Sequence, residues 1–163
     1  MAVAGYPCGY GVKCPAKGAG GDYSTVRDTQ AQTFRCVADV CGKGCAAATL
    51  TVMLATILEA GTCSTESISG LTNHINRYIL NKNFNDRFIT GFICLFDKES
   101  KILQYVSCGH EPVYLIRGGE ITELTSKNLP LGIMDEEYEL KEHKIEPGDV
   151  MFIYSDGVIE YID

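Results

Sequence analysis

The feature that most constrains the fold of this chain is a series of short apolar, β-branched and aromatic segments in its second half. Most neighbouring segments are separated by only a few residues. The connections 97–100 and 118–119 are two examples and indicate turns. Parallel neighbours need a crossover of a dozen or more residues, so such short connections predict antiparallel strands. The expected strands are 88–96, 102–107, 113–117, 120–124, 138–145 and 150–154.

The first half of the chain predicts one strand and two helices. Residues 33–39 are largely apolar and run into a glycine-rich turn, which indicates a strand. Residues 46–59 are apolar or small at nearly every position, which predicts a helix buried on all sides. Residues 67–81 have apolar side chains at helical spacing and predict an amphipathic surface helix. We therefore expect an α+β fold with antiparallel sheets in the centre and helices outside.

Size and charge limit what the chain can do. Its 163 residues are 45% hydrophobic and no linker divides them, so 1–163 is expected to be a single domain. The formal net charge is −7 and the basic residues do not cluster, which argues against nucleic-acid and anionic-membrane partners. Neither a leader nor the roughly 20 apolar residues of a membrane span is visible, so a cytoplasmic location is expected.

The eight cysteines are expected to be reduced thiols, because the sequence shows no secretory signal. Cys36, Cys41 and Cys45 nevertheless lie close together, so a cysteine-based redox or metal-binding protein is a remote alternative. It is the weaker interpretation because no Cys-x-x-Cys pair occurs and a reduced Cys is an ordinary core residue. The sequence assigns no role to these three or to Cys8 and Cys14.

Three carboxylates lie in glycine-bearing turns: Asp22, Asp39 and Asp156. Two of them, Asp39 and Asp156, follow expected strands and could meet at one edge of the sheets. Oxygen ligands of this kind suit Mg²⁺ or Mn²⁺ rather than zinc. Two such cations roughly 3.5–4 Å apart can activate a water and hold a phosphate during hydrolysis. Any single Asp-Gly or Gly-Asp pair is more often an ordinary turn.

Taken together, these turns resemble the motifs of a known family. The motifs, in order, are Gly20-Gly21-Asp22-Tyr23, Asp39-Val40-Cys41-Gly42-Lys43-Gly44, Cys108-Gly109-His110-Glu111-Pro112, Leu129-Pro130-Leu131-Gly132-Ile133, Pro147-Gly148-Asp149 and Tyr154-Ser155-Asp156-Gly157. Their order and spacing are similar to those of the SpoIIE/RsbU/RsbX group of PPM (PP2C-like) metal-dependent serine/threonine phosphatases. The resemblance covers nearly the whole chain.

The resemblance implies a fold, a cofactor and a substrate. The fold is a four-layer αββα sandwich of two antiparallel sheets flanked by helices, and the cofactor is two Mn²⁺ or Mg²⁺ ions. The substrate is phosphoserine or phosphothreonine on a phosphorylated regulatory protein, often a STAS-type anti-sigma-factor antagonist. A metal-activated water would carry out the hydrolysis.

Position by position, the resemblance also implies the site. Asp39 would bridge both metals, the carbonyl of Val40 would bind beside it, Asp156 would bind one metal, and Asp22 would bind directly or through water. These three aspartates are the expected catalytic set.

Other residues near these motifs are expected to shape the site. Lys43 could meet the phosphate, although a solvated lysine is the commoner outcome in such a turn. His110 is more often a partner of the backbone than a general acid. The expected structural residues near the site are Gly21, Gly42, Gly44, His110 and Gly157.

The family pattern continues beyond the point where this sequence ends. A further strand bearing an Asp-Asp pair would complete the metal site, so we expect a domain truncated at its C-terminus that lacks its last strand. The alternative function is therefore a catalytically impaired signalling or binding module. An unpaired sheet edge left by that strand could also join two copies as a homodimer.

Overall fold

The computed structural model describes residues 21–61, 67–82, 84 and 87–155. The described elements, in chain order, are β1 (Tyr23–Asp28), β2 (Gln32–Val40), α1 (Cys45–Gly61), α2 (Ile68–Lys82), β3 (Ile89–Asp97), β4 (Ile102–Cys108), β5 (Val113–Arg117), β6 (Glu120–Leu124), β7 (Lys141–Lys144) and β8 (Val150–Phe152). Neither of these helices has the length and apolar character needed to cross a membrane.

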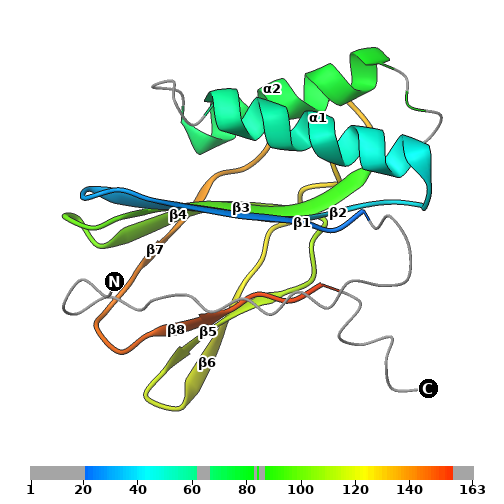
Figure 1. Ribbon diagram of the computed structural model, residues 1–163. Helices are drawn as coiled ribbons and strands as arrows, with labels where there is room; N and C mark the ends of the chain where they lie inside the picture. The colour runs from blue at the N-terminus through cyan, green and yellow to red at the C-terminus, as the bar shows by residue number, and fades with distance from the viewer. Residues whose placement is uncertain (1–20, 62–66, 83, 85–86, 156–163) are drawn as a thin grey trace, which may run out of the picture.

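Two antiparallel sheets face each other, and both helices cover the outer face of the larger one (Figure 1). The larger sheet has the strand order β1-β2-β3-β4-β7, and the smaller has the order β6-β5-β8. The predicted α+β class and its two antiparallel sheets are therefore confirmed. The described residues form three of the four predicted layers. The predicted lack of a last strand stays a prediction.

Two apolar cores hold the layers together. Alternate residues of β2 are buried, and they pack against α1 and α2 as Phe34, Cys36, Ala38 and Val40. The second core belongs to the facing sheets and contains Phe92, Cys94, Leu103, Tyr105, Val113, Leu115 and Leu124. β3 contributes to both cores because successive strand residues point to opposite faces. This central strand therefore packs against the helices on one face and against the smaller sheet on the other. It begins beside the site described below.

The prediction that the first helix is buried on all sides is wrong. α1 buries Ala47, Leu50, Leu54 and Leu58 at helical spacing, whereas Val52 is 64% exposed. The helix lies on an outer face of a sheet, so only one stripe of it can be covered. The second helix is amphipathic as predicted, with Ile75 and its neighbours facing the core.

The last predicted strand differs in length and burial from the observed one. β8 covers only Val150–Phe152 and pairs with β5 alone among the described strands. Val150 is 55% exposed and Phe152 is 50% exposed. The run is apolar but lies at the edge of the smaller sheet, so its expected burial is corrected. The predicted strand 138–145 is likewise shortened, to Lys141–Lys144.

A buried carboxylate closes the turn between β7 and β8. Asp149 accepts hydrogen bonds from Nε and Nη2 of Arg117 at 2.8 and 2.7 Å. It also accepts one from the backbone N–H of Glu146 at 2.8 Å. The Asp149 side chain is 2% exposed, whereas that of Arg117 is 40% exposed. Hydrogen bonding by Arg117 holds the pKa of the Asp149 carboxyl below its ordinary value.

Replacing this carboxylate should make the protein less stable in a pH-dependent way. We expect Asp149→Asn to lower the free energy of unfolding by about 1–2 kcal/mol at neutral pH, because charged hydrogen bonds are lost at a partly screened site. The folded-state pKa is depressed, so this contribution is complete above the unfolded value of about 3.9. It disappears as the pH falls through the folded-state pKa.

Urea unfolding between about pH 7 and pH 3 measures this effect, and the wild-type and Asp149→Asn curves should converge towards acid. The control is Glu146→Gln, which removes only a more exposed ion pair of 3.2 Å with Arg117. It should leave the unfolding midpoint almost unchanged. A difference between wild type and Asp149→Asn that stays constant over the whole pH range would contradict the linkage.

Candidate metal centre

Two of the three predicted carboxylates lie side by side at the ends of neighbouring strands. β1 and β2 are antiparallel, with Tyr23 opposite Ala38, and the N–H of Val40 donates to the carbonyl of Gly21 at 3.3 Å. This register places Asp22 opposite Asp39. Directly opposite residues share one face, with Cβ atoms about 4.5–5.5 Å apart. Asp39 is half-buried and Asp22 is exposed.

Gly21 leaves an open space next to the oxygen atoms of Asp39 and Val40. A Cβ atom at residue 21 would collide with the carbonyl oxygen of Val40 and lie 3.0 Å from Oδ1 of Asp39. The Gly21 carbonyl also accepts a 3.3 Å hydrogen bond from the Thr51 hydroxyl of α1. A carboxylate oxygen and a carbonyl oxygen thus border one small space that only glycine leaves open.

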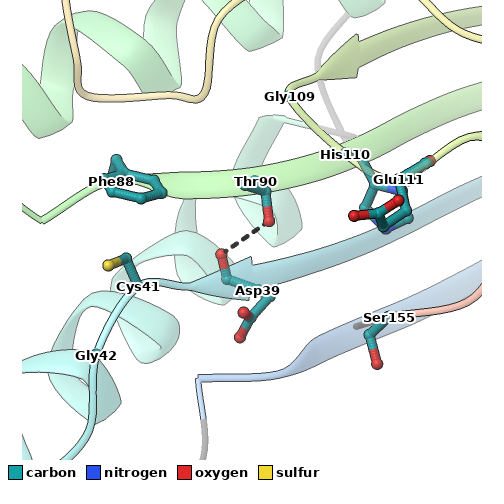
Figure 2. A pocket seen from close by; sticks show the side chains of 9 residues that line it. All are labelled: Asp39, Cys41, Gly42, Phe88, Thr90, Gly109, His110, Glu111 and Ser155. Atoms are coloured by element: carbon teal, nitrogen blue, oxygen red, sulfur yellow. Dashed lines mark hydrogen bonds between the residues drawn. The ribbon is translucent and has the colours of Figure 1, made fainter. Parts of the chain in front are cut away.

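A pocket of about 290 Å³ is bordered by Asp39 and by residues of the larger sheet and of segments next to the smaller one (Figure 2). It is lined by Asp39, Cys41, Gly42, Phe88, Thr90, Gly109, His110, Glu111 and Ser155. Asp39 and Thr90 belong to the larger sheet, while Ser155 follows β8 of the smaller one. Ser155 directly precedes Asp156. Asp156 and Gly157 themselves lie outside the described residues.

The turn after β2 has a backbone shape that requires glycine. Gly42 and Gly44 have φ values of 98° and 88°, in the left-handed region that other residues rarely adopt. Lys43 between them is exposed. Arg87 supports the turn, because its Nη1 donates to the carbonyl of Cys41 at 2.8 Å. Arg87 could not be selected from the sequence, since a single arginine between helix and strand has no distinguishing pattern.

His110 contacts the backbone and an aromatic ring. Its Nδ1 lies 2.8 Å from the carbonyl oxygen of Glu111, a distance that lets a protonated Nδ1 donate. The ring lies 6.3 Å from that of Phe92, measured between centroids. The preceding Gly109 has a φ of 60°, and a Cβ there would come within 2.6 Å of Cγ of Pro130. Glu111 also lines the pocket. It belongs to the motif Cys108-Gly109-His110-Glu111-Pro112, but the sequence did not predict it as a site residue.

The donor atoms present fit a hard divalent cation. Asp22 and Asp39 offer carboxylates and Val40 offers a carbonyl, and Mg²⁺ and Mn²⁺ favour such oxygen ligands. The open space beside Gly21 is bordered by two of these oxygens. No group of three His, Cys, Asp or Glu side chains converges within the part of the chain that the structure describes. The third predicted carboxylate, Asp156, lies outside that part.

The described cysteines show no sign of a shared metal or redox site. Cys36, Cys94 and Cys108 are free and buried, Cys41 is half-buried and Cys45 is exposed. Burial raises the pKa of the Cys36 and Cys108 thiols well above the ordinary value and that of Cys94 to about 12. Thiolates are the reactive form, so the three buried thiols should be inert. Cys8 and Cys14 lie outside the described residues.

A labelling experiment checks this difference in reactivity between exposed and buried thiols. Maleimide at about pH 7.5 should modify Cys45 in the native protein, because it is exposed. Cys36, Cys94 and Cys108 should react only after denaturation, and peptide mass spectrometry assigns each site. Native labelling of the three buried thiols at the rate of Cys45 would contradict the described packing.

The family follows from comparison with known proteins. A family model described as Stage II sporulation protein E (SpoIIE) matches residues 29–163. The chain belongs to the SpoIIE family. This result confirms the group of phosphatases that the motifs predicted.

Curated relatives agree with this assignment. The phosphoserine phosphatase RsbU of Bacillus subtilis is 31% identical over 153 residues, which cover 91% of this chain and 45% of RsbU. Stage II sporulation protein E of Priestia megaterium is 27% identical over 110 residues, which cover 66% of this chain and 18% of the relative. The chain thus spans less than half the length of the curated relatives it matches.

Solved structures confirm the fold. The RsbU and RsbW domains of a Mycobacterium tuberculosis protein match with a TM-score of 0.77 at 23% identity, covering 86% of this chain and 40% of that one. The PP2C phosphatase domain of SpoIIE from Bacillus subtilis matches with a TM-score of 0.75 at 19% identity, covering 86% and 41%. RsbX in complex with magnesium matches with a TM-score of 0.72 at 21% identity, covering 84% and 66%.

Proposed function

We propose that this SpoIIE-family chain hydrolyses phosphoserine or phosphothreonine on a regulatory protein, with Mn²⁺ or Mg²⁺ as cofactors. The observation that carries the proposal is the pair Asp22 and Asp39 at neighbouring strand ends, beside a pocket that also contains Ser155. The similarity to the phosphoserine phosphatase RsbU supports the same chemistry. The magnesium complex of the structural neighbour RsbX supports the choice of cation.

In the proposed mechanism the chain binds and orients, and the cations supply the reactive water. Asp39 and Asp22, with the Val40 carbonyl, would hold the cations at the open space beside Gly21, and Asp156 would complete the set. Bound cations of this kind lower the pKa of a water and neutralise charge on the phosphate. The hydroxyl of Thr90 donates to the carbonyl of Asp39 at 3.5 Å, which helps fix the strand end (Figure 2).

The proposed substrate is a phosphorylated regulatory protein, possessing a STAS-type fold as in anti-sigma-factor antagonists. RsbU is among the relatives, and another structural neighbour belongs to the bacterial stressosome, with a TM-score of 0.71 at 19% identity. The pocket has a volume of about 290 Å³ and contains Ser155, which follows β8, opposite residues of the larger sheet. A cytoplasmic location is part of this proposal.

Metal dependence tests the proposal directly. The longest natural form of the protein should hydrolyse p-nitrophenyl phosphate and a phosphoserine protein when Mn²⁺ is added, and EDTA should abolish turnover. Calorimetric titration with Mn²⁺ measures binding separately from turnover. Tight Mn²⁺ binding without any turnover would replace the proposed enzyme by the binding-module alternative. Turnover that persists in EDTA would refute the metal-dependent chemistry.

A further inference from the structure

The guanidinium of Arg87 occupies the place that a side chain at residue 42 would fill. Its Nη1 donates to the carbonyl of Cys41 at 2.8 Å. A Cβ atom on Gly42 would collide with that nitrogen and lie 2.9 Å from Cζ. Cys41 and Gly42 both line the pocket that begins at Asp39. A cation therefore lies directly against two of the residues that line the candidate active site, although Arg87 itself is not a lining residue.

The positive charge of Arg87 has no acidic partner among the described residues. Within the described residues no carboxylate lies within 4.0 Å of Arg87, although five other ion pairs are present. The side chain is half-buried. A guanidinium has five N–H donors in a fixed fork, and the Cys41 carbonyl accounts for one of them. A half-buried Arg with donors to spare beside a pocket suits an anion.

We propose that Arg87, which lies beside this pocket against Cys41, binds the phosphate group of the substrate. The inference rests on the proposed phosphatase function and adds the residue that recognises the phosphorylated side chain. Phosphate oxygens match the fork of a guanidinium, and Gly42 keeps the space in which that fork lies. Arg87 thus takes the role that the sequence suggested for Lys43, an exposed residue.

Equilibrium binding of inorganic phosphate tests this assignment without requiring turnover. At saturating Mn²⁺, calorimetry should show that Arg87→Ala weakens phosphate binding by at least about tenfold, because charge-assisted hydrogen bonds are lost. Arg87→Lys keeps the charge without the fork and should weaken it less. Phosphate affinity that is unchanged in both variants would overturn the proposal. So would a loss that occurs in Lys43→Ala and in neither Arg87 variant.

Two glycine variants separate the position of the guanidinium from backbone strain. Gly42 and Gly44 have similar positive φ values, 98° and 88°. A Cβ at Gly42 meets Arg87, whereas a Cβ at Gly44 meets no atom within 4 Å. Gly42→Ala should therefore weaken phosphate binding with Arg87 still present, and Gly44→Ala should weaken it much less. Equal phosphate affinities in these two variants would contradict the proposed position of Arg87.

The same measurements distinguish phosphate binding from mere support of the turn. A purely supporting Arg87 would change the Mn²⁺ affinity and the unfolding temperature and leave the phosphate affinity at saturating Mn²⁺ unaltered, which overturns the proposal. In a second experiment a phosphoserine peptide replaces inorganic phosphate. If Arg87→Ala weakens peptide binding as well, Arg87 binds the phosphate of the substrate. A wild-type protein that binds phosphate through Arg87 but shows no turnover refutes the proposed function alone.

Discussion

Asp39→Ala should reduce Mn²⁺-dependent turnover of p-nitrophenyl phosphate by about 10²–10³-fold or more, a loss typical of removing one group that stabilises transition-state charge. Asp39 ends β2 and lines the pocket, and its Oδ1 borders the open space beside Gly21. Without it, one of the two aspartates that the structure places together at the strand ends is gone. The cations should then bind more weakly, which calorimetric Mn²⁺ titration of the same variant measures.

The fold should tolerate this change, because Asp39 is half-buried at a strand end next to Asp22. Like charges on opposite strand positions repel, so the free energy of unfolding should change by less than about 1 kcal/mol. The control is Asp135→Ala, whose exposed carboxylate forms a 3.7 Å pair with Arg77. It should retain full turnover. Unchanged turnover in Asp39→Ala would remove this residue from the mechanism.

Local sequence patterns were sufficient for most of the fold. The apolar and β-branched segments 33–39 and 102–107 predicted strands that the structure places within a residue or two of those limits. The short turns at 97–100 and 118–119 imposed the antiparallel pairing of their flanking strands. These features depend on neighbours in sequence, so they can be recognised without knowledge of the tertiary structure.

The site was only partly accessible from the sequence. Asp22 and Asp39 could be selected because glycine-bearing acidic turns form a recognisable pattern. Arg87 could not, because its importance comes from a contact with Cys41, 46 positions away in the chain. Glu111 likewise lines a pocket whose other residues, such as Asp39 and Ser155, are distant in the sequence. Contacts of this kind depend on how the layers are stacked, which no local pattern reports.

The burial of α1 was overestimated for a related reason. Composition alone cannot tell which apolar residues of a helix face the protein, because alanine, valine and leucine occur on every side of it. The structure places α1 on the outer face of the larger sheet (Figure 1). Leu54 is consequently 2% exposed, while Val52, two residues earlier, is 64% exposed. The two residues form a natural test of the one-sided packing.

Leu54→Ala should lower the free energy of unfolding by about 2–5 kcal/mol, because it removes buried methyl groups and leaves a cavity between helix and sheet. Val52→Ala should change it by no more than about 0.5 kcal/mol, because that side chain is largely in water. Urea unfolding of both variants measures the difference. Comparable losses would mean that the exposed side of α1 is covered in solution, as the all-sided apolar pattern first predicted. A large loss in Leu54→Ala alone would instead establish that a single stripe of this helix holds it on the sheet.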